Sequence, residues 1–166
     1  MTLAEAAAQG EEFAQSGSER ELADLRAKWA DDLEGAARSA DFRERAVAFR
    51  AIGQFRWRAK EELLRRGLDD ESPACRGSAL LSLELLSRDH PSTINGVRAL
   101  LHTLATADGN AAVRRLAILC LKNGSAERNT IVLLEGLAAD DEADAELRRA
   151  AGNVAQHLKK KQTKKS

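Results

Sequence analysis

Apolar residues recur every three or four positions along most of the chain, and this spacing places side chains on one face of a helix. Ile94, Val97, Leu101 and Leu104 show it best. Gly, Asn, Ser and Asp residues interrupt the pattern and mark short turns. We interpret each amphipathic stretch as the first helix of a helix pair. These stretches are 19–38, 57–66, 93–105 and 127–138.

The first residues predict one further helix, over 2–15. Thr2 is placed to cap it, and Glu5 stands three residues later, which completes the pattern of a capping box. Ser16, Gly17 and Ser18 then predict a break. We expect this short helix to shield the first helix pair.

The second helices carry a repeated motif, an apolar residue followed by Arg-x-x-Ala. Its four copies begin at Phe42, Cys75, Val113 and Leu147. The corresponding arginines are Arg43, Arg76, Arg114 and Arg148, which lie 33, 38 and 34 residues apart. This near-constant period is typical of helical-hairpin repeats. The pattern predicts a single repeat domain over 1–158, with repeats at about 19–56, 57–89, 92–124 and 126–158.

An acidic residue stands six positions before the motif arginine in three of the four copies. These residues are Asp70, Asp108 and Glu142, whereas the first copy has Ala37. An acid in such a turn can cap the helix that follows, since it accepts from the free backbone N–H groups. The recurrent Ala lets two helices approach closely. One pair cannot cover its own apolar face, so stacking of pairs must supply the core.

An acidic turn followed by apolar-Arg-x-x-Ala resembles the HEAT repeat, including the shorter HEAT-like repeats of phycobilisome-lyase relatives. The resemblance covers about residues 19–158 and implies a right-handed α-solenoid of about four HEAT-like hairpins, with the extra N-terminal helix. It also implies that the first helices form the convex face and the second helices the concave face. Turn acids and arginines would form a structural ladder between neighbouring repeats, made here of Asp70, Arg76, Asp108, Arg114, Glu142 and Arg148.

Composition supports the all-α fold class, because the chain has only two prolines, no tyrosine and a core that must be built mainly of Leu and Ala. Cys75 and Cys120 fall on apolar helix positions and are expected to be buried free thiols. The sequence shows neither a secretory signal nor an apolar run of membrane-spanning length, so we expect a cytoplasmic protein.

The formal net charge of zero conceals two basic segments. Residues 43–66 contain eight basic and three acidic residues, and 159–166 contain five lysines and no acid. We expect 159–166 to be a disordered tail. Within the first segment, Arg56, Trp57 and Arg58 could hold phosphates and stack on a base, or grip an acidic protein surface. Alternatively, Trp57 is a core residue and its charged neighbours are solvated or paired.

A second candidate surface is a row on the second helices, formed by Arg45, Arg115 and Arg149 with Asn153 at its border. Equivalent positions of stacked repeats line up, so this row could be a concave anion-binding stripe. The sequence contains no motif for phosphate binding, metal binding or nucleophilic catalysis. His90, His102 and His157 lie far apart and are not spaced as metal ligands. We expect no catalytic residue, metal or cofactor.

Two functions follow as hypotheses. The first is a non-catalytic scaffold or adaptor that binds a protein partner on the concave face. The alternative is a nucleic-acid binder that uses residues 43–66 and the lysine tail, similar to the HEAT-like alkylpurine DNA glycosylases. A tetrapyrrole lyase or chaperone, like some phycobilisome relatives, is a more remote hypothesis, because no Cys, His or Tyr site can be assigned to it.

Overall fold

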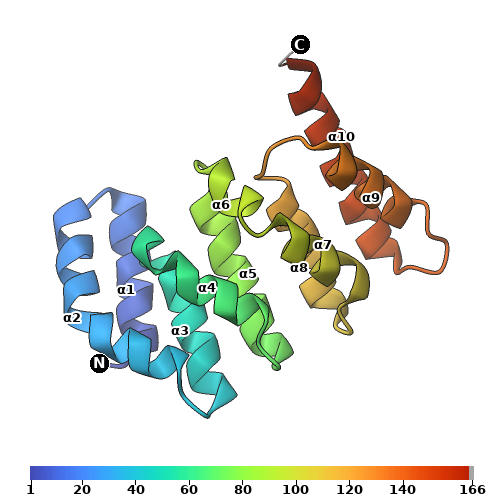
Figure 1. Ribbon diagram of the computed structural model, residues 1–166. Helices are drawn as coiled ribbons and strands as arrows, with labels where there is room; N and C mark the ends of the chain where they lie inside the picture. The colour runs from blue at the N-terminus through green and yellow to red at the C-terminus, as the bar shows by residue number, and fades with distance from the viewer. Residues whose placement is uncertain (165–166) are drawn as a thin grey trace. The chain divides into compact units, whose positions relative to one another are not determined.

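The computed structural model describes residues 1–164, and within them the chain is helical and contains no strand (Figure 1). This confirms the predicted all-α class. The helices are α1 (Leu3–Ser16), α2 (Glu19–Ala37), α3 (Phe42–Gln54), the 3-10 helix η1 (Arg58–Lys60), α4 (Glu61–Leu68), α5 (Pro73–Ser87), α6 (Pro91–Asn95), α7 (Arg98–Ala107), α8 (Ala111–Leu121), α9 (Arg128–Ala138) and α10 (Ala145–Lys164). No helix of the described residues combines the length and the apolar character that a membrane crossing requires.

The helices group into two compact units. The first comprises Met1–Leu86 and the second begins at Ser87. Each unit buries its own set of large apolar side chains. In the first unit these include Phe55, Leu22, Ile52 and Leu80, and in the second Ile94, Leu101, Ile118 and Leu134. Trp29, Val113 and Ala117 are buried. The free thiols of Cys75 and Cys120 are also buried, as predicted.

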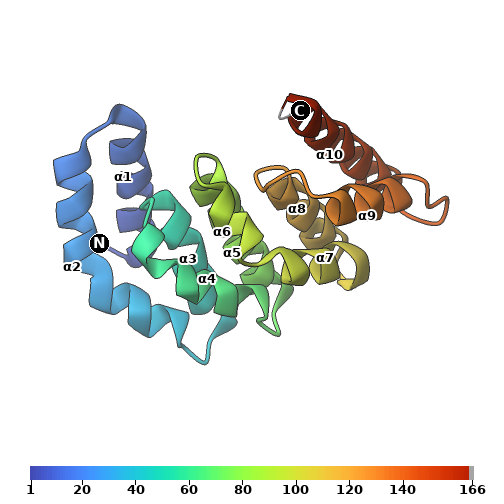
Figure 2. The ribbon, with the colours of Figure 1, turned by 45° about the horizontal axis from the view of Figure 1, so that its top comes forward.

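In the first unit, α1 packs against both α2 and α3, so it is part of the core of the first pair (Figure 2). Thr2 and Glu5 form the predicted capping box, and Gly17 ends the helix in the left-handed conformation that glycine adopts easily, at φ +74°. The phenyl ring of Phe55 lies against Gly10 of α1, so close that a Cβ there would be 2.5 Å from the ring. Glycine is therefore required at that contact.

Helices α3 and α5 cross with their backbones in close contact. The buried hydroxyl of Ser82 on α5 shares its hydrogen between the carbonyls of Phe49 and Arg50, and it accepts from the backbone N–H of Gly53 at 2.9 Å. A Cβ at Gly53 would lie 2.6 Å from the Cα of Ser82. Only glycine allows this approach without moving a helix.

The first copy of the sequence motif is shifted by two residues from the prediction. From Nη1, Arg45 donates to the carbonyls six and five residues before it, those of Ser39 and Ala40. Arg76 makes the same two contacts, to Asp70 and Glu71. Arg45, not Arg43, is thus the equivalent of Arg76. The alanine three residues after Arg45 is Ala48, which is fully buried, like Ala79, Ala117 and Ala151 in the other copies.

Two of the predicted first helices are interrupted. The stretch 57–66 begins as the 3-10 helix η1, and only then continues as α4. The stretch 93–105 divides at Gly96 and Val97 into α6 and α7. Arg98, the first residue of α7, is almost buried, and it binds Thr130 and Glu127 at 2.8 and 2.9 Å. These contacts attach the first turn of α7 to α9 and to the residue before it.

The expected disordered tail is helical as far as the structure describes it. α10 continues through Lys164, and residues 165–166 of the predicted tail lie outside the described residues. Lys159 pairs with Glu135 of α9 at 2.8 Å. Lys161 donates to the carbonyls of Lys122 and Gly124 at the end of α8, at 2.7 and 3.1 Å. These side chains hold the lysine-rich end of α10 against both neighbouring helices.

Candidate binding groove

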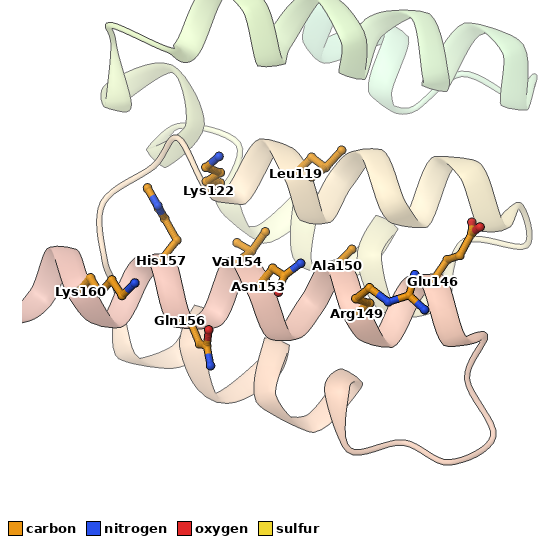
Figure 3. A pocket seen from close by; sticks show the side chains of 10 residues that line it. All are labelled: Leu119, Lys122, Glu146, Arg149, Ala150, Asn153, Val154, Gln156, His157 and Lys160. Atoms are coloured by element: carbon orange, nitrogen blue, oxygen red, sulfur yellow. The ribbon is translucent and has the colours of Figure 1, made fainter.

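A groove of about 550 Å³ lies between α8 and α10 in the second unit (Figure 3). α8 contributes residues from its C-terminal end, and α10 contributes residues that recur at helical spacing along one face. The residues that line it are Leu119, Lys122, Glu146, Arg149, Ala150, Asn153, Val154, Gln156, His157 and Lys160. Its volume is in the range of sites that hold a small ligand or a short peptide segment.

The middle of the groove is apolar. Leu119 of α8 is 42% exposed, and Ala150 and Val154 of α10 lie opposite it. Next to these residues, the side chains of Asn153 and Gln156 are exposed to solvent. Each amide offers two donors and one acceptor oxygen. The groove can therefore bury an apolar side chain while it hydrogen-bonds to adjacent polar groups.

Three cations at the groove have no ion-pair partner among residues 1–164. They are Lys122, Arg149 and Lys160. The one acidic residue in the lining, Glu146, is paired with Arg115 at 2.7 Å. Because that pair neutralises the carboxylate, the groove has a positive potential.

The position of Lys160 follows from helix geometry. Successive residues of a helix point about 100° apart, so three consecutive lysines cannot face the same neighbour. Lys159 is directed to Glu135 on α9, and Lys161 to the backbone at the end of α8. Lys160 is the one of the three that lines the groove.

His157 faces the same end of the groove as Lys122 and Lys160. Burial lowers the pKa of its imidazole below the ordinary value of 6.5, and the charges of Lys161, Lys122, Lys160 and Lys164 lower it further. Burial and these charges thus both favour the neutral form of the ring. A negative charge that arrived near it would raise this pKa.

The structure brings together only part of the predicted row. Arg149 and Asn153 line the groove, and Arg115 forms an ion pair with Glu146, which is also a lining residue. Arg45 does not belong to an anion-binding stripe, because its guanidinium forms two hydrogen bonds with the carboxylate of Asp70, at 2.9 and 3.0 Å. Burial alone would raise the pKa of Asp70, but the hydrogen bonds from Arg45 and the Ser72 amide outweigh it and hold the pKa below its usual value.

The basic segment 43–66 is largely engaged within the first unit. Arg56 has a left-handed backbone, at φ +50°, and its guanidinium donates to the carbonyl of Gly53 at 2.7 Å. Arg58 pairs with Glu61 at 3.4 Å. The half-buried ring of Trp57 meets Phe55 edge to face, and the ammonium of Lys60 lies 5.3 Å from its centre. Arg56, Arg58 and Lys60 are thus engaged in contacts within the first unit, whereas Trp57 is partly exposed and is not a core residue.

Two arginines of the predicted ladder have contacts that the structure describes. Arg76 donates to the backbone carbonyl of Asp70, and the carboxylate of Asp70 accepts from Arg45. Arg148 pairs with Asp141 at 3.7 Å and not with Glu142.

The predicted capping by the turn acids is also altered. Asp108 accepts from the N–H of Asn110 inside the turn, and it is Asn110 that caps α8. Arg114 donates to the carbonyl of Ala105 at 2.9 Å. Asp70 and Asp108 thus accept from N–H groups inside their turns, those of Ser72 and Asn110.

Sequence reasoning missed Leu119, Lys122, His157 and Lys160 as groove residues. Arg149, Asn153, His157 and Lys160 recur at intervals of four, four and three on α10, and this spacing was the signal that could have joined them. Among residues 1–164, no three His, Cys, Asp or Glu side chains cluster as a metal site would require. No protein-family model matches the chain, and no match was found among curated proteins or solved structures.

Proposed function

We propose that the protein is a non-catalytic scaffold or adaptor, and that the groove between α8 and α10 is a docking site for a protein partner. The observation that carries the proposal is the combination in one groove of the exposed Leu119 with two exposed amides and three cations that have no ion-pair partner among residues 1–164. Apolar anchoring with a polar rim is the usual composition of protein interfaces.

Engaged cations weigh against nucleic-acid binding through residues 43–66. Arg45, Arg58 and Lys60 are paired with acids of the first unit, at 2.9, 3.4 and 2.7 Å. Phosphate binding would have to break these pairs, and that cost reduces the affinity that released counterions provide. These three ion pairs therefore support the protein-binding hypothesis over phosphate binding by the same side chains.

We propose further that the helix pairs stack as a right-handed HEAT-like solenoid, with α3, α5, α8 and α10 on its concave face. In support, the arginine motif recurs in all four helices, and the alanine that follows each arginine is fully buried. Small-angle scattering tests this arrangement. An elongated particle is expected, whereas a maximum dimension typical of a compact sphere of 166 residues would contradict it.

A photo-crosslinking amino acid at Asn153 tests the docking site in cells that express the protein. Asn153 is exposed in the groove, so illumination should produce discrete protein adducts. The matched control is the same substitution at Asn129, an exposed asparagine of α9. Adducts that are equal at both positions, or missing at Asn153, would contradict the proposed docking site.

A further inference from the structure

The groove between α8 and α10 has a definite charge distribution along its length. Arg149 lies toward one end, and Lys122 and Lys160 lie at the other, with Leu119 and Val154 between them (Figure 3). Arg149 and Lys160 are eleven residues apart on one helix, which corresponds to roughly 16 Å at 1.5 Å per residue. A ligand that satisfies all the cations must therefore carry negative charge at both ends.

The apolar centre constrains the middle of the ligand. Leu119 is exposed, and Ala150 is a small residue beside Val154, so a large apolar side chain has a surface to cover. Burial of such a side chain is favourable at about 25 cal/mol per Å² of apolar surface. The amides of Asn153 and Gln156 can bind the N–H and C=O groups of a peptide backbone beside it.

These features fit one class of ligand. We propose that the groove binds an acidic segment of a partner protein, in which carboxylates flank one large apolar side chain. The inference rests on the proposed function and names the chemistry of the partner. About five extended residues span the distance between the cations, at 3.3 Å per residue.

A nucleic acid fits the groove less well. Sequence-independent binding of single strands combines a track of cations with aromatic side chains that stack on bases. The lining contains no Phe or Trp, and its central side chains are aliphatic. A lining that combines aliphatic side chains with three cations suits an acidic peptide better than a chain of phosphates.

The test is a selection of random 16-residue peptides displayed on phage, with the immobilised full chain as bait. Enriched peptides are then synthesised, and their affinity is measured by fluorescence anisotropy. The test variant is Lys122→Glu/Arg149→Glu/Lys160→Glu, and the apolar test variant is Leu119→Ser. The control is Arg20→Glu/Lys28→Glu/Arg128→Glu, which makes the same change of net charge at exposed positions away from the groove. Circular dichroism verifies that all variants are folded.

We expect enriched peptides to carry several Asp or Glu residues around a Leu, Ile, Phe or Trp. The triple groove variant should bind them at least tenfold more weakly, Leu119→Ser should also weaken binding, and the control should bind like the wild type. Affinity should fall as salt is raised, because the charges are exposed.

Other outcomes separate the two proposals. If the enriched peptides require Leu119 but carry no excess of acidic residues, the proposal of an acidic ligand is wrong, whereas the proposal of a docking site is retained. Peptides that bind every variant equally, or no enrichment at all, would overturn the docking site itself. A mixed-sequence single strand of DNA serves as the competing probe. If it binds and the triple groove variant abolishes that binding, the ligand class is nucleic acid and the proposal is wrong.

Discussion

The substitution Gly53→Ala tests the close crossing of α3 and α5. A Cβ at position 53 would lie 2.6 Å from both the Cα and the Oγ of Ser82. Since the nearest atoms include backbone, a side-chain rotation cannot relieve the contact, and α5 must shift. The shift would also lengthen the hydrogen bond from the Gly53 N–H to the Ser82 hydroxyl.

The magnitude follows from three contributions. Overpacking against backbone costs about 3 kcal/mol, the upper end of the usual range. Weakening of one buried hydrogen bond adds about 1 kcal/mol. Replacement of glycine by alanine in a helix returns about 1 kcal/mol. We therefore expect Gly53→Ala to lower the free energy of unfolding by about 3 kcal/mol.

Urea unfolding monitored by tryptophan fluorescence is the appropriate assay. Trp29 and Trp57 are the only two tryptophans and both belong to the first unit, so the signal reports on the unit that contains Gly53. With a urea dependence of about 1–3 kcal/mol per M, the midpoint should fall by roughly 1–3 M.

The matched control is Gly35→Ala in α2, where no atom lies within 4 Å of the added Cβ. It should raise stability by up to about 1 kcal/mol. If Gly53→Ala changed stability by less than about 1 kcal/mol, or behaved like Gly35→Ala, the close crossing would be refuted.

Four further predictions address other contacts. In a double-mutant cycle of Arg45→Gln and Asp70→Asn, each single change should destabilise the protein, and the double change should cost less than their sum. Because the folded pKa of Asp70 is lowered from 3.8, the stabilisation from this pair should be present at neutral pH and be lost as the pH falls from 3.8 through that lower pKa. Ala117→Asp places a carboxylate at a fully buried position and should cost about 3 kcal/mol or more, measured by thermal unfolding followed by circular dichroism. Burial, and then the charge of Arg98, lower the pKa of His102 below 6.5, so the unfolded protein binds more protons than the folded protein below that pH. The free energy of unfolding should therefore fall from pH 6.5 to 5. In urea titrations followed by circular dichroism, His102→Gln should make this fall smaller. If an acidic peptide binds the groove, its charge should raise the pKa of His157, so the affinity for the peptide should increase as the pH falls from 7.5 to 5.5. Anisotropy titrations of the His157→Gln variant should show no such increase.

Local patterns predicted the helices well. The capping box at Thr2 and Glu5 depends on residues three apart in sequence, so it was visible without tertiary information. The buried alanines at 79, 117 and 151 were found because they recur at a fixed distance from an arginine. Such patterns lie within one helix, and helical spacing alone determines which residues share a face.

Contacts between helices were predicted less well. Phe42-Arg43-Glu44-Arg45 offers two arginines for one motif position. The folded contacts of Arg45 decide between them, because it binds the carbonyls of Ser39 and Ala40 and the carboxylate of Asp70, 25 residues away. The groove was missed for the same reason. Lys159 forms an ion pair with Glu135, which lies 24 residues earlier in the chain. Residues close to a lysine in sequence therefore do not show whether its charge is paired.

The arginines of the first unit also determine where the chain can change in length. Arg45 binds the carbonyls of Ser39 and Ala40, and Arg76 binds those of Asp70 and Glu71, so each turn is attached to the helix that follows it. An added residue in either turn would move a carbonyl away from its guanidinium. In the second unit, Arg148 reaches the exposed turn around Asp141 and Glu142 through the carboxylate of Asp141, at 3.7 Å, and not through a backbone carbonyl of that turn. Insertions that arise during evolution, or an epitope placed there by design, should be accommodated in that turn and rejected by the other two.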